Sequence, residues 1–412
     1  MTQTSGIGLY LHIPFCDRLC HYCDFVKTAW HEPADQMAYL RALSDRLLEF
    51  LRFWDSYSPS LPIRFDTLFF GGGTPSVFTD AYAPLFEILR PYLAPGAEIT
   101  LEANPEHMQA DRLKIWRDLG FNRLSLGVQS FDAAGLSFLT RTHTAAAALE
   151  SVQLARESFR NLNIDLIYAW PGQTRKSWQR DLELALSLDL GHLSLYSLTF
   201  EGRTPLARRV QRGVLDPLAD ELQEQFYQDA RLMLASKGWV HEEVSNWAKP
   251  GFETRHNALY WNGGSYLGIG AGAHSYLEQL GPWGLRFHQG PHWKSFARSR
   301  PEVAPLSLQA LLAGSEYEIE QDRDAQSWLL EHVSSGLRTA RGINLAAICA
   351  KTGYSWAPNH VIKMALEMGQ LSLDAQHQCR LNSDEWYRET RWALEMALSF
   401  VAENSAEKPL SF

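Results

Sequence analysis

Short apolar segments alternate with longer amphipathic segments along the first part of the chain. The apolar run IGLYLHI at 7–13 is followed at 34–51 by apolar residues at the spacing of a helix with one buried face. The same pair recurs, with strand candidates at 7–13, 66–73, 98–104, 123–130, 163–172 and 192–198 and helix candidates at 34–51, 81–93, 107–120, 145–159, 177–188 and 219–238. This alternation predicts parallel strands joined by helical crossovers. The fold is then an α/β barrel or an open doubly wound sheet, with functional residues at the carboxyl ends of the strands.

The pattern changes near residue 300. The stretch RSRPEVAPLS at 298–307 is typical of a loop. The segment after it is helix-rich through residue 333, with short strand candidates at 370–374 and 378–382. We therefore expect a barrel-like domain at 1–304 and a smaller, mostly helical domain at 305–412.

Composition narrows the class of protein. A chain of 412 residues that is 45% hydrophobic can bury a sizeable core, and a formal net charge of -9 offers no basic surface for a nucleic acid backbone. The amino terminus lacks the regions of a signal peptide, and no run of about 18 apolar residues could span a membrane. Two of the five cysteines, Cys349 and Cys379, are expected to be ordinary buried thiols. We expect a cytoplasmic globular protein without a nucleic acid partner.

The other three cysteines, Cys16, Cys20 and Cys23, follow the first predicted strand. Their clustering suits a metal site in a reducing compartment better than a disulfide framework. Structural zinc usually takes four protein ligands, so zinc would need His12 or His21 as the fourth. An iron–sulfur cluster normally takes one thiolate per iron, so three thiolates leave one iron open to a small molecule. The number of ligands therefore favours a cluster over zinc.

Several motifs occur in a specific order along the chain. They are YLHIPFCDRLCHYCDF at 10–25, FFGGGTPS at 69–76, LEANPE at 101–106, RLSLGVQSFD at 123–132, NIDLIYAWPGQT at 163–174, HNALYW at 256–261 and GLRTARGI at 336–343. Together they resemble the radical S-adenosylmethionine (SAM) superfamily, in the branch that contains oxygen-independent coproporphyrinogen III oxidase. The resemblance implies a partial (β/α)6 TIM-like barrel with a smaller, mostly helical C-terminal domain, like that of the oxidase and winged-helix-like. It also implies a [4Fe–4S] cluster on Cys16, Cys20 and Cys23, SAM on the open iron, and an electron donor that the sequence does not identify.

The resemblance also assigns residues to SAM. Gly71, Gly72 and Gly73 follow a strand, where missing side chains let backbone amides approach a ligand. A tight turn into a helix capped by Thr74 or Ser76 is the structural alternative. The other positions that match family residues at the SAM and cluster site are Tyr10, Thr74, Glu102, Gln129, Arg141 and Asp165. The alternatives there are core packing of Tyr10, a solvated strand-end carboxylate at Glu102, and ordinary barrel salt bridges at the Arg141 and Asp165 positions.

A second glycine-rich stretch, YLGIGAGAH, lies at 266–274. Its glycines fall at alternate positions and do not match the G-x-G-x-x-G pattern of dinucleotide-binding proteins. We therefore reject a dinucleotide site. The resemblance implies a loop at the barrel mouth, and a tight turn explains the glycines equally well.

Two departures from the oxidase pattern favour the HemW-type heme chaperones of the same branch. Phe25 stands two residues after Cys23, where the oxidase has a further cysteine, and the segment before Tyr10 is shorter than in the oxidase. The stretch HNALYW matches the chaperone pattern HNxxYW, which implies a heme site with an axial histidine and flat aromatic neighbours. The residues of that site are His256, Asn257, Tyr260 and Trp261.

Two functions therefore stay open at this point. The first is a heme chaperone that uses its cluster and SAM in transferring heme to client hemoproteins. The second is a radical SAM enzyme that acts on a tetrapyrrole or another substrate, and Phe25 argues only against the oxidase form of it. A satisfied loop histidine at His256 and a core tryptophan at Trp261 are the structural alternatives to a heme site. The sequence does not decide the oligomeric state, a homodimer included.

Overall fold

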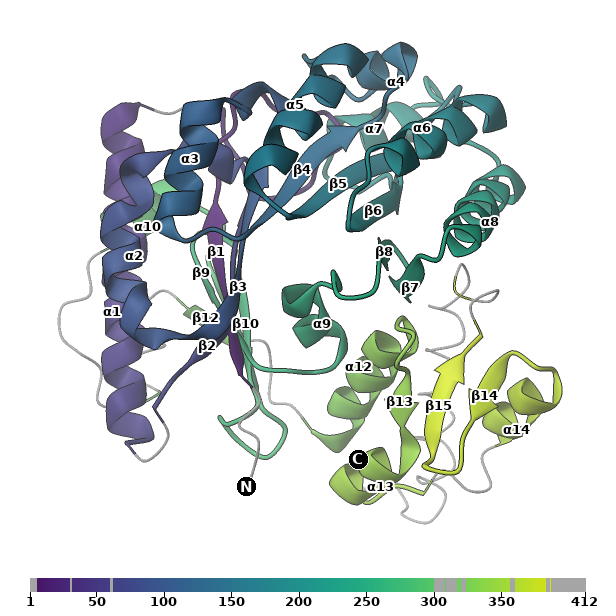
Figure 1. The fold of residues 1–412 in the computed structure, drawn as a ribbon. Coiled ribbons are helices and arrows are strands. Elements are labelled where there is room, and N and C mark those ends of the chain that lie inside the picture. Colours follow the sequence, from purple (N-terminus) through teal and green to yellow (C-terminus); the bar gives the residue numbers. More distant parts are fainter. Residues whose placement is uncertain are drawn as a thin grey trace.

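The computed structural model describes residues 6–29, 32–59, 62–299, 308, 317–319, 324–355, 360–382 and 386. Six parallel strands form the centre of its largest sheet (Figure 1). They are β1 (Ile7–Ile13), β2 (Phe65–Gly72), β3 (Leu93–Ala103), β4 (Arg123–Gln129), β5 (Asn161–Tyr168) and β6 (His192–Ser197). Each of the six strands expected between residues 7 and 198 overlaps one of these, and their parallel pairing is confirmed.

The sheet continues beyond both β1 and β6. On the side of β1 lie β9 (Tyr266–Ile269), β10 (His274–Leu277), β11 (Leu285–Gln289) and β12 (Tyr317–Ile319), and on the side of β6 lie β8 (Asn246–Ala248) and β7 (Val240–Glu243). β9 is parallel to β1, and the remaining edge strands are antiparallel to their neighbours. Among the described residues the sheet ends at β12 and β7, which do not pair, so the barrel is partial. The sequence did not reveal these edge strands because runs of three to five residues carry little alternation.

Helices cover the outer face of the central strands (Figure 1). The helices of this part of the chain are α1 (Pro33–Tyr57), α2 (Ala83–Leu89), α3 (Ala110–Leu119), α4 (Ala133–Phe138), α5 (Ala145–Ser158), α6 (Arg175–Ser187), α7 (Pro205–Gln211), α8 (Asp220–Ser236), α9 (Arg255–Trp261) and α10 (Trp293–Arg298). All six expected helices are present. Threonine side chains cap α5 and α6 at Thr144 and Thr174, which satisfies amides that the first turn of a helix leaves unpaired.

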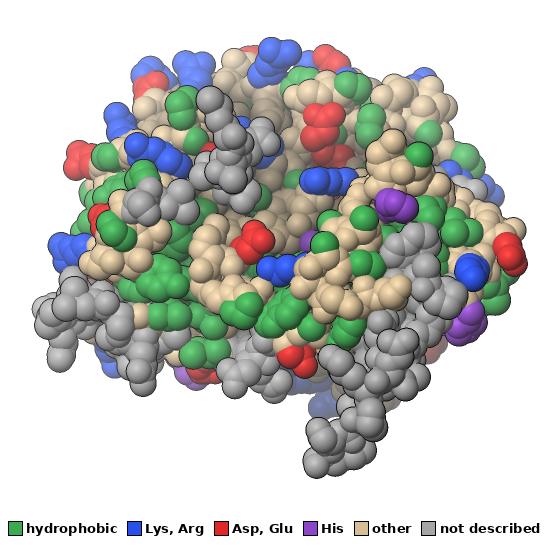
Figure 2. Space-filling model, turned by 90° about the horizontal axis from the view of Figure 1, so that it is seen from below, with side chains coloured by type: hydrophobic (Ala, Val, Ile, Leu, Met, Phe, Trp, Pro, Cys, Tyr) green, Lys and Arg blue, Asp and Glu red, His purple; other side chains and the backbone are tan. Residues whose placement is uncertain are grey.

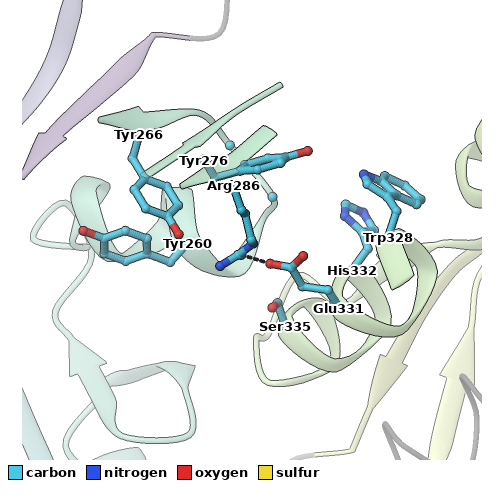
Figure 3. A pocket seen from close by; sticks show the side chains of 10 residues that line it. Tyr260, Tyr266, Tyr276, Arg286, Trp328, Glu331, His332 and Ser335 are labelled. Carbon is cyan, nitrogen blue, oxygen red and sulfur yellow. Dashed lines mark ion pairs between the residues drawn. The ribbon is translucent and has the colours of Figure 1, made fainter. Parts of the chain in front are cut away.

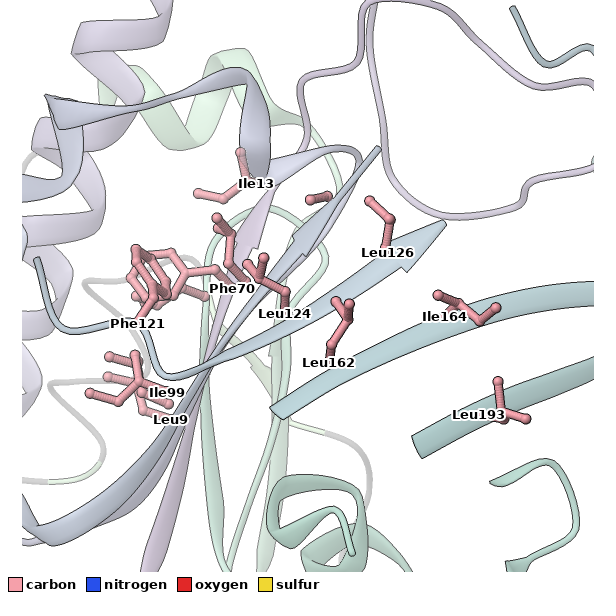
Figure 4. Close-up of a cluster of buried hydrophobic side chains, with 14 of the residues drawn as sticks. Leu9, Ile13, Phe70, Ile99, Phe121, Leu124, Leu126, Leu162, Ile164 and Leu193 are labelled. Carbon is pink, nitrogen blue, oxygen red and sulfur yellow. The ribbon is translucent and has the colours of Figure 1, made fainter. Parts of the chain in front are cut away.

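The central strands have an apolar outer face and a polar inner face. On β1, Leu9, Leu11 and Ile13 are fully buried among the helices, whereas Tyr10 and His12 lie between them in sequence and point to the other side. Figure 4 shows the same apolar layer continuing along the neighbouring strands. The outward positions therefore build the core, and the inward positions are available for polar chemistry.

A second, three-stranded sheet lies in the last described part of the chain (Figure 1). Its elements are α12 (Ala325–Leu337), β13 (Ile343–Asn344), α13 (Leu345–Thr352), α14 (His360–Glu367), β14 (Leu371–Leu373) and β15 (Gln378–Leu381), and the strand order is β13-β15-β14. The backbone bonds Val244 N–H to Arg338 O (3.2 Å) and Ala340 N–H to Glu242 O (2.9 Å) join the turn after α12 to the β7 edge. The boundary expected near residue 305 lies outside the described residues, so the division into two domains stays a prediction.

The surface carries charges of both signs, and Cys349 and Cys379 lie outside the loop that follows β1. Viewed from the side of the strand amino ends, positive and negative side chains are interspersed (Figure 2). No helix in the described ranges is both long enough and apolar enough to cross a membrane. Cys379 is buried as expected, Cys349 is only half-buried, and neither forms a disulfide with a described residue.

The glycine-rich stretch at 266–274 forms β9 and its turn into β10. A side chain at Gly268 would meet the carbonyl oxygen of His274 at 2.1 Å, and the Gly268 amide donates to Ser275 Oγ at 2.9 Å. Gly270 and Gly272 follow with positive φ angles, which glycine adopts without strain. The stretch is therefore partly a strand rather than a loop throughout, and its glycines serve a close contact between two strands.

We predict that Gly268→Ala destabilises the protein by about 2 kcal/mol, since a methyl group must push the β10 backbone away. Gly202→Ala is the matched control, because nothing lies within 4 Å of a side chain built there. Urea unfolding of both variants beside the wild type measures the difference. Equal stability of the two variants would contradict the proposed contact.

Candidate functional site

The three clustered cysteines lie on the loop that follows β1. The base of this loop is closed by Cys16 N–H donating to Thr28 O (2.9 Å) and Thr28 N–H donating to Pro14 O (2.7 Å). All three thiols are free, Cys16 being buried and Cys20 and Cys23 half-buried. Burial raises the pKa of the Cys16 thiol to about 11, and the neighbouring Cys20 and Cys23 thiols add to the shift. The three sulfur atoms are therefore near enough to influence one another electrostatically.

The geometry of this loop bears on the choice between zinc and a cluster. Among the described residues, no three cysteine, histidine or acidic side chains are gathered at the distances needed to bind one metal ion. His12 has both ring nitrogens engaged, Nδ1 with the Tyr10 hydroxyl (3.0 Å) and Nε2 with Val26 O (2.7 Å). His21 has a buried Nδ1 for which the described residues provide no hydrogen-bond partner. An iron–sulfur cluster needs no convergence on one ion, because each thiolate binds a different iron.

Gly71, Gly72 and Gly73 end β2 and pack directly against β1 and the cysteine loop. A side chain at Gly72 would come within 2.5 Å of the His12 ring, and one at Gly73 within 2.9 Å of Cys16 Sγ. The Gly73 amide donates to Ile13 O (2.7 Å) and the Gly72 amide to Glu102 Oε2 (3.1 Å). These two amides are thus used within the protein. The absence of side chains is what lets the cysteine loop approach the sheet.

Two carboxyl groups sit on the inner face of the barrel at the next strands. Burial raises the pKa of Glu102 to about 8, the charge of Asp165 adds to the shift, and the hydrogen bond from Gly72 opposes it. Burial also raises the pKa of Asp165, although Asn163 Nδ2 donates to it at 2.8 Å. Glu102 and Asp165 would both ionise more readily if a cation lay beside them. A sulfonium or an ammonium group is a ligand that suits this pair.

Arg141 connects the cysteine loop with the carboxyl ends of β3 and β4. Its guanidinium donates to Asn104 Oδ1 (2.7 Å) and Gly127 O (3.0 Å), and Nη1 lies 3.8 Å from Cys20 Sγ. Its Nε is buried and has no partner among the described residues. The positively charged Arg141 side chain therefore lies beside the thiols with its Nε–H donor still available, where it could bind the carboxylate of a ligand.

The two remaining expected residues of this group lie at the same end of the barrel. Thr74 is buried, its amide donates to Phe15 O (2.8 Å), and its hydroxyl accepts from Asn104 Nδ2 (3.4 Å). Gln129 ends β4 with a φ of 70°, in the left-handed region that is uncommon for residues other than glycine. Strain of this kind is often found where a backbone position is fixed for function.

The motif HNALYW occupies the opposite end of the barrel. Helix α9 carries it, and His256 binds residues at the amino ends of the strands: its Nδ1 pairs with Thr67 Oγ1 at 2.7 Å, and its amide donates to Glu98 at 3.1 Å. Its Nε2 pairs with the Tyr260 hydroxyl at 2.8 Å. Burial lowers the pKa of His256 to about 3, so the ring is neutral, and it stacks on Phe69 at 5.0 Å. An iron could bind this ring only after one of its two partners leaves.

The other residues of that motif are less enclosed. Asn257, Tyr260 and Trp261 are half-buried. The Arg338 guanidinium lies 4.6 Å above the Trp261 ring, and Tyr260 meets Tyr266 edge to face at 4.5 Å. The structure therefore brings together the cysteines and the expected SAM residues, but it places the expected heme residues at the far end of the strands.

Sequence reasoning missed a clamp on the cysteine loop. His107 Nε2 pairs with Asp17 Oδ2 and His107 Nδ1 with Ser76 Oγ, both at 2.7 Å. Asp17 directly follows Cys16, so this chain of three residues fixes the start of the loop to two neighbouring segments. No short motif could have revealed it, since His107 lies 90 residues from Asp17 and 31 from Ser76.

Comparison with known proteins adds to this geometry. The model of the radical SAM superfamily matches residues 10–185. The heme chaperone HemW of Lactococcus lactis is 37% identical over 76% of this chain and 79% of its own, and that of Escherichia coli is 36% identical over 73% and 78%. The solved structure of coproporphyrinogen III oxidase (HemN) from Escherichia coli, a radical SAM enzyme, gives a TM-score of 0.74 at 21% identity over 95% of this chain and 90% of its own. The expected radical SAM barrel is thereby confirmed as the fold.

We predict that Glu102 makes stability fall as pH rises. In the SAM-free protein the folded state keeps its proton up to pH about 8, whereas the unfolded state loses it near 4.5. Below pH 4.5 Glu102 is protonated in both the folded and the unfolded state, so its contribution to stability is fully present. That contribution, on the order of a few kcal/mol, decreases as the pH rises and is lost above pH 8.

Urea unfolding of wild type and Glu102→Gln at pH 5 and pH 8 measures this loss. The substitution should remove much of the decrease seen in the wild type between the two values. The exposed Glu87 supplies the control, Glu87→Gln, which should behave as the wild type does. An unchanged pH dependence in Glu102→Gln would refute the assignment.

Proposed function

This chain belongs to the HemW family of the radical SAM superfamily, and we propose that it is a heme chaperone, which binds heme and transfers it to client hemoproteins. The observation that carries the proposal is the identity of 36–37% to HemW proteins over about three quarters of both chains. Identity to the oxidase of the same fold is 21%, which supports the shared fold and no more. Activity as a chaperone is therefore favoured over oxidation of coproporphyrinogen.

Membership of the superfamily implies a [4Fe–4S] cluster and SAM, and the residues at the barrel mouth fit both. Cys16, Cys20 and Cys23 supply three soft sulfur donors on one loop, which leaves one iron of the cluster for SAM. When bound, the two groups supply one-electron chemistry. Burial raises the pKa values of the Cys16 and Cys23 thiols, which favours their protonated forms in the free protein. They release protons when the metal binds.

The chain's own groups orient SAM in this proposal. Arg141 would bind the SAM carboxylate through its Nε donor, for which no partner is found in the described part of the chain. Glu102 and Asp165 would face the positive charge of the sulfonium and the ribose hydroxyls, and that charge would favour the ionised form of both carboxyl groups. Tyr10, the three glycines, Thr74 and Gln129 shape the surrounding wall. The polar inner face of the barrel thus holds the ligand, while the apolar outer face holds the strands in place.

We further propose that the protein is cytoplasmic, that client hemoproteins receive the heme, and that an electron donor serves the cluster. We also propose that the chain divides at residue 305 into a barrel and a smaller winged-helix-like domain. A radical SAM enzyme acting on a tetrapyrrole is the second candidate, since the barrel has the fold of the oxidase.

We predict that Cys20→Ala removes the cluster, since only two thiolates remain for four irons. Iron and acid-labile sulfide should fall close to zero after anaerobic reconstitution, while the far-ultraviolet circular dichroism stays unchanged. Cys349→Ala is the control, because this half-buried cysteine lies outside the loop and should keep full iron content. Unchanged iron and sulfide in Cys20→Ala would exclude the cluster from this loop.

The chaperone function predicts saturable binding of hemin to the reconstituted protein at one site, followed by the Soret absorbance. Addition of apomyoglobin should then yield holomyoglobin from the loaded protein. The competing function is tested in the same preparation with coproporphyrinogen III, SAM and dithionite. Release of carbon dioxide without saturable hemin binding would establish an oxidase instead.

A further inference from the structure

Four exposed arginines lie on and beside helix α7, and we call them the α7 arginines. Arg208 and Arg209 stand in the last turn of the helix, Arg203 precedes it, and Arg212 follows it. No acidic residue occurs between residues 202 and 215, although the whole chain has a formal net charge of -9. A cation near the last turn stabilises a helix through its dipole, which explains part of this charge but not Arg203 at the other end.

The α7 arginines differ from other arginines in having no acidic partner among the described residues. Arg175, by contrast, pairs with Asp229 at 2.6 Å. Arg286 pairs with Glu331, and the two side chains fill the small pocket between the barrel edge and α12 (Figure 3). The charges of the α7 arginines are therefore directed at solvent and at any molecule that approaches this face.

Helix α7 is attached to the cysteine loop. The Leu206 amide donates to His21 O at 3.1 Å. Leu206 also belongs to a small apolar cluster against which Tyr22 of the loop packs. His21 and Tyr22 stand between Cys20 and Cys23 in the sequence. The helix that carries the positive charge thus lies beside the part of the loop that holds two of the three expected cluster ligands.

The cysteine loop itself presents apolar side chains to solvent. Leu19 is 48% exposed and Phe25 is 67% exposed, and in the sequence they flank the half-buried Cys20 and Cys23. Val214, shortly after α7, is 66% exposed. Protein interfaces combine apolar residues with a polar rim and are enriched in Phe and Arg. The composition of this surface therefore fits a protein partner.

We propose that the α7 arginines and the exposed part of the cysteine loop form a docking site for an acidic protein that carries one electron on a flavin or an iron–sulfur centre. The proposal rests on the proposed function only through the cluster on Cys16, Cys20 and Cys23, and it identifies the class of the electron donor. One electron passes from the carrier to the cluster, so the carrier is oxidised and the cluster is reduced. No bond forms or breaks, and no proton moves.

The position of the charges favours an electron carrier over an anionic membrane. Electron transfer requires the donor to come close to the cluster, and this face lies beside its thiol ligands. Encounters between redox proteins bury little surface, and opposite charges accelerate them without tight binding. The apolar positions Leu206 and Ala207 of α7 are buried in the protein, so they are not available for contact with lipid.

The test uses flavodoxin, a small acidic protein that carries FMN. The triple variant Arg208→Gln, Arg209→Gln and Arg212→Gln removes three positive charges from the proposed site. The rate constant for reduction of the cluster by reduced flavodoxin should fall about tenfold or more at low ionic strength, because electrostatic steering is lost. Anaerobic stopped flow measures this rate from the visible absorbance of the oxidised cluster. Added salt should slow the wild type much more than the variant.

A second measurement does not depend on the cluster. The α7 arginines are held by contacts within the protein, so the cluster-free protein should also bind oxidised flavodoxin. Calorimetry at low ionic strength should show a loss of affinity in the triple variant that parallels the loss of rate. Replacing the same three arginines by lysine should restore both, because steering depends on charge and not on the shape of the guanidinium.

The matched control removes the same amount of charge from the opposite end of the barrel. Arg52, Arg90 and Arg117 are exposed and lie at or near the carboxyl ends of α1, α2 and α3. Their joint replacement by Gln should leave most of the rate and affinity intact. Dithionite needs no docking site, so it should still reduce the cluster of every variant completely.

Three outcomes would overturn the proposal. The first is an equal rate and affinity in the wild type and the triple variant. The second is lack of binding by both flavodoxin and an acidic [2Fe–2S] ferredoxin. The third is loss of binding to phosphatidylglycerol vesicles in the triple variant with unchanged affinity for flavodoxin, which would assign the face to a membrane. Failure of the cluster assignment is recognised separately, since the reconstituted wild type would then lack iron while calorimetry still reports on docking.

Discussion

The parallel pairing of the six central strands is the constraint on which the rest of this structure depends. Parallel strands bring their carboxyl ends to one edge, so residues from distant parts of the sequence meet there. The register that sets His12 opposite Gly71 and Ile13 opposite Gly72 also sets the cysteine loop against the glycine turn. A slip of one residue would turn Tyr10 and His12 outward and bring Leu11 into the polar interior. Packing of the outer face and chemistry of the inner face are therefore specified together.

Much of this arrangement could be predicted from the sequence, for a physical reason. Long apolar runs between amphipathic helices identify parallel strands, and the rule for their carboxyl ends locates Glu102, Arg141 and Asp165 near the cysteines. The clamp of Asp17, His107 and Ser76 could not be predicted, because it joins side chains through space alone. The placement of α9 was also hidden. A pattern such as HNALYW states which residue types are present but not at which end of the barrel they lie.

The two ends of the barrel have different electrostatic characters. At the carboxyl ends, burial raises the pKa values of the Cys16 thiol and the Glu102 carboxyl group, so both groups stay protonated until a cationic or metallic partner binds. At the amino ends, His256 is neutral and already satisfied, and it serves as a fixed support for Tyr260. The Tyr260 hydroxyl is bonded to His256 in the barrel floor, and Tyr260 also lines the small pocket between the barrel edge and α12. Helix α9 is thus a common wall between the interior of the barrel and the contact with α12.

The clamp on the cysteine loop affects how the protein responds to oxygen. Hydrogen bonds from Cys16 to Thr28 and from His107 to Asp17 hold the loop through the polypeptide itself and do not depend on iron. The entropy of ordering the loop is therefore met when the chain folds, not when the metal arrives. Loss of the cluster to oxygen would then leave the conformation of the cysteine loop unchanged. Rebuilding the cluster becomes a local repair and does not require the chain to fold again.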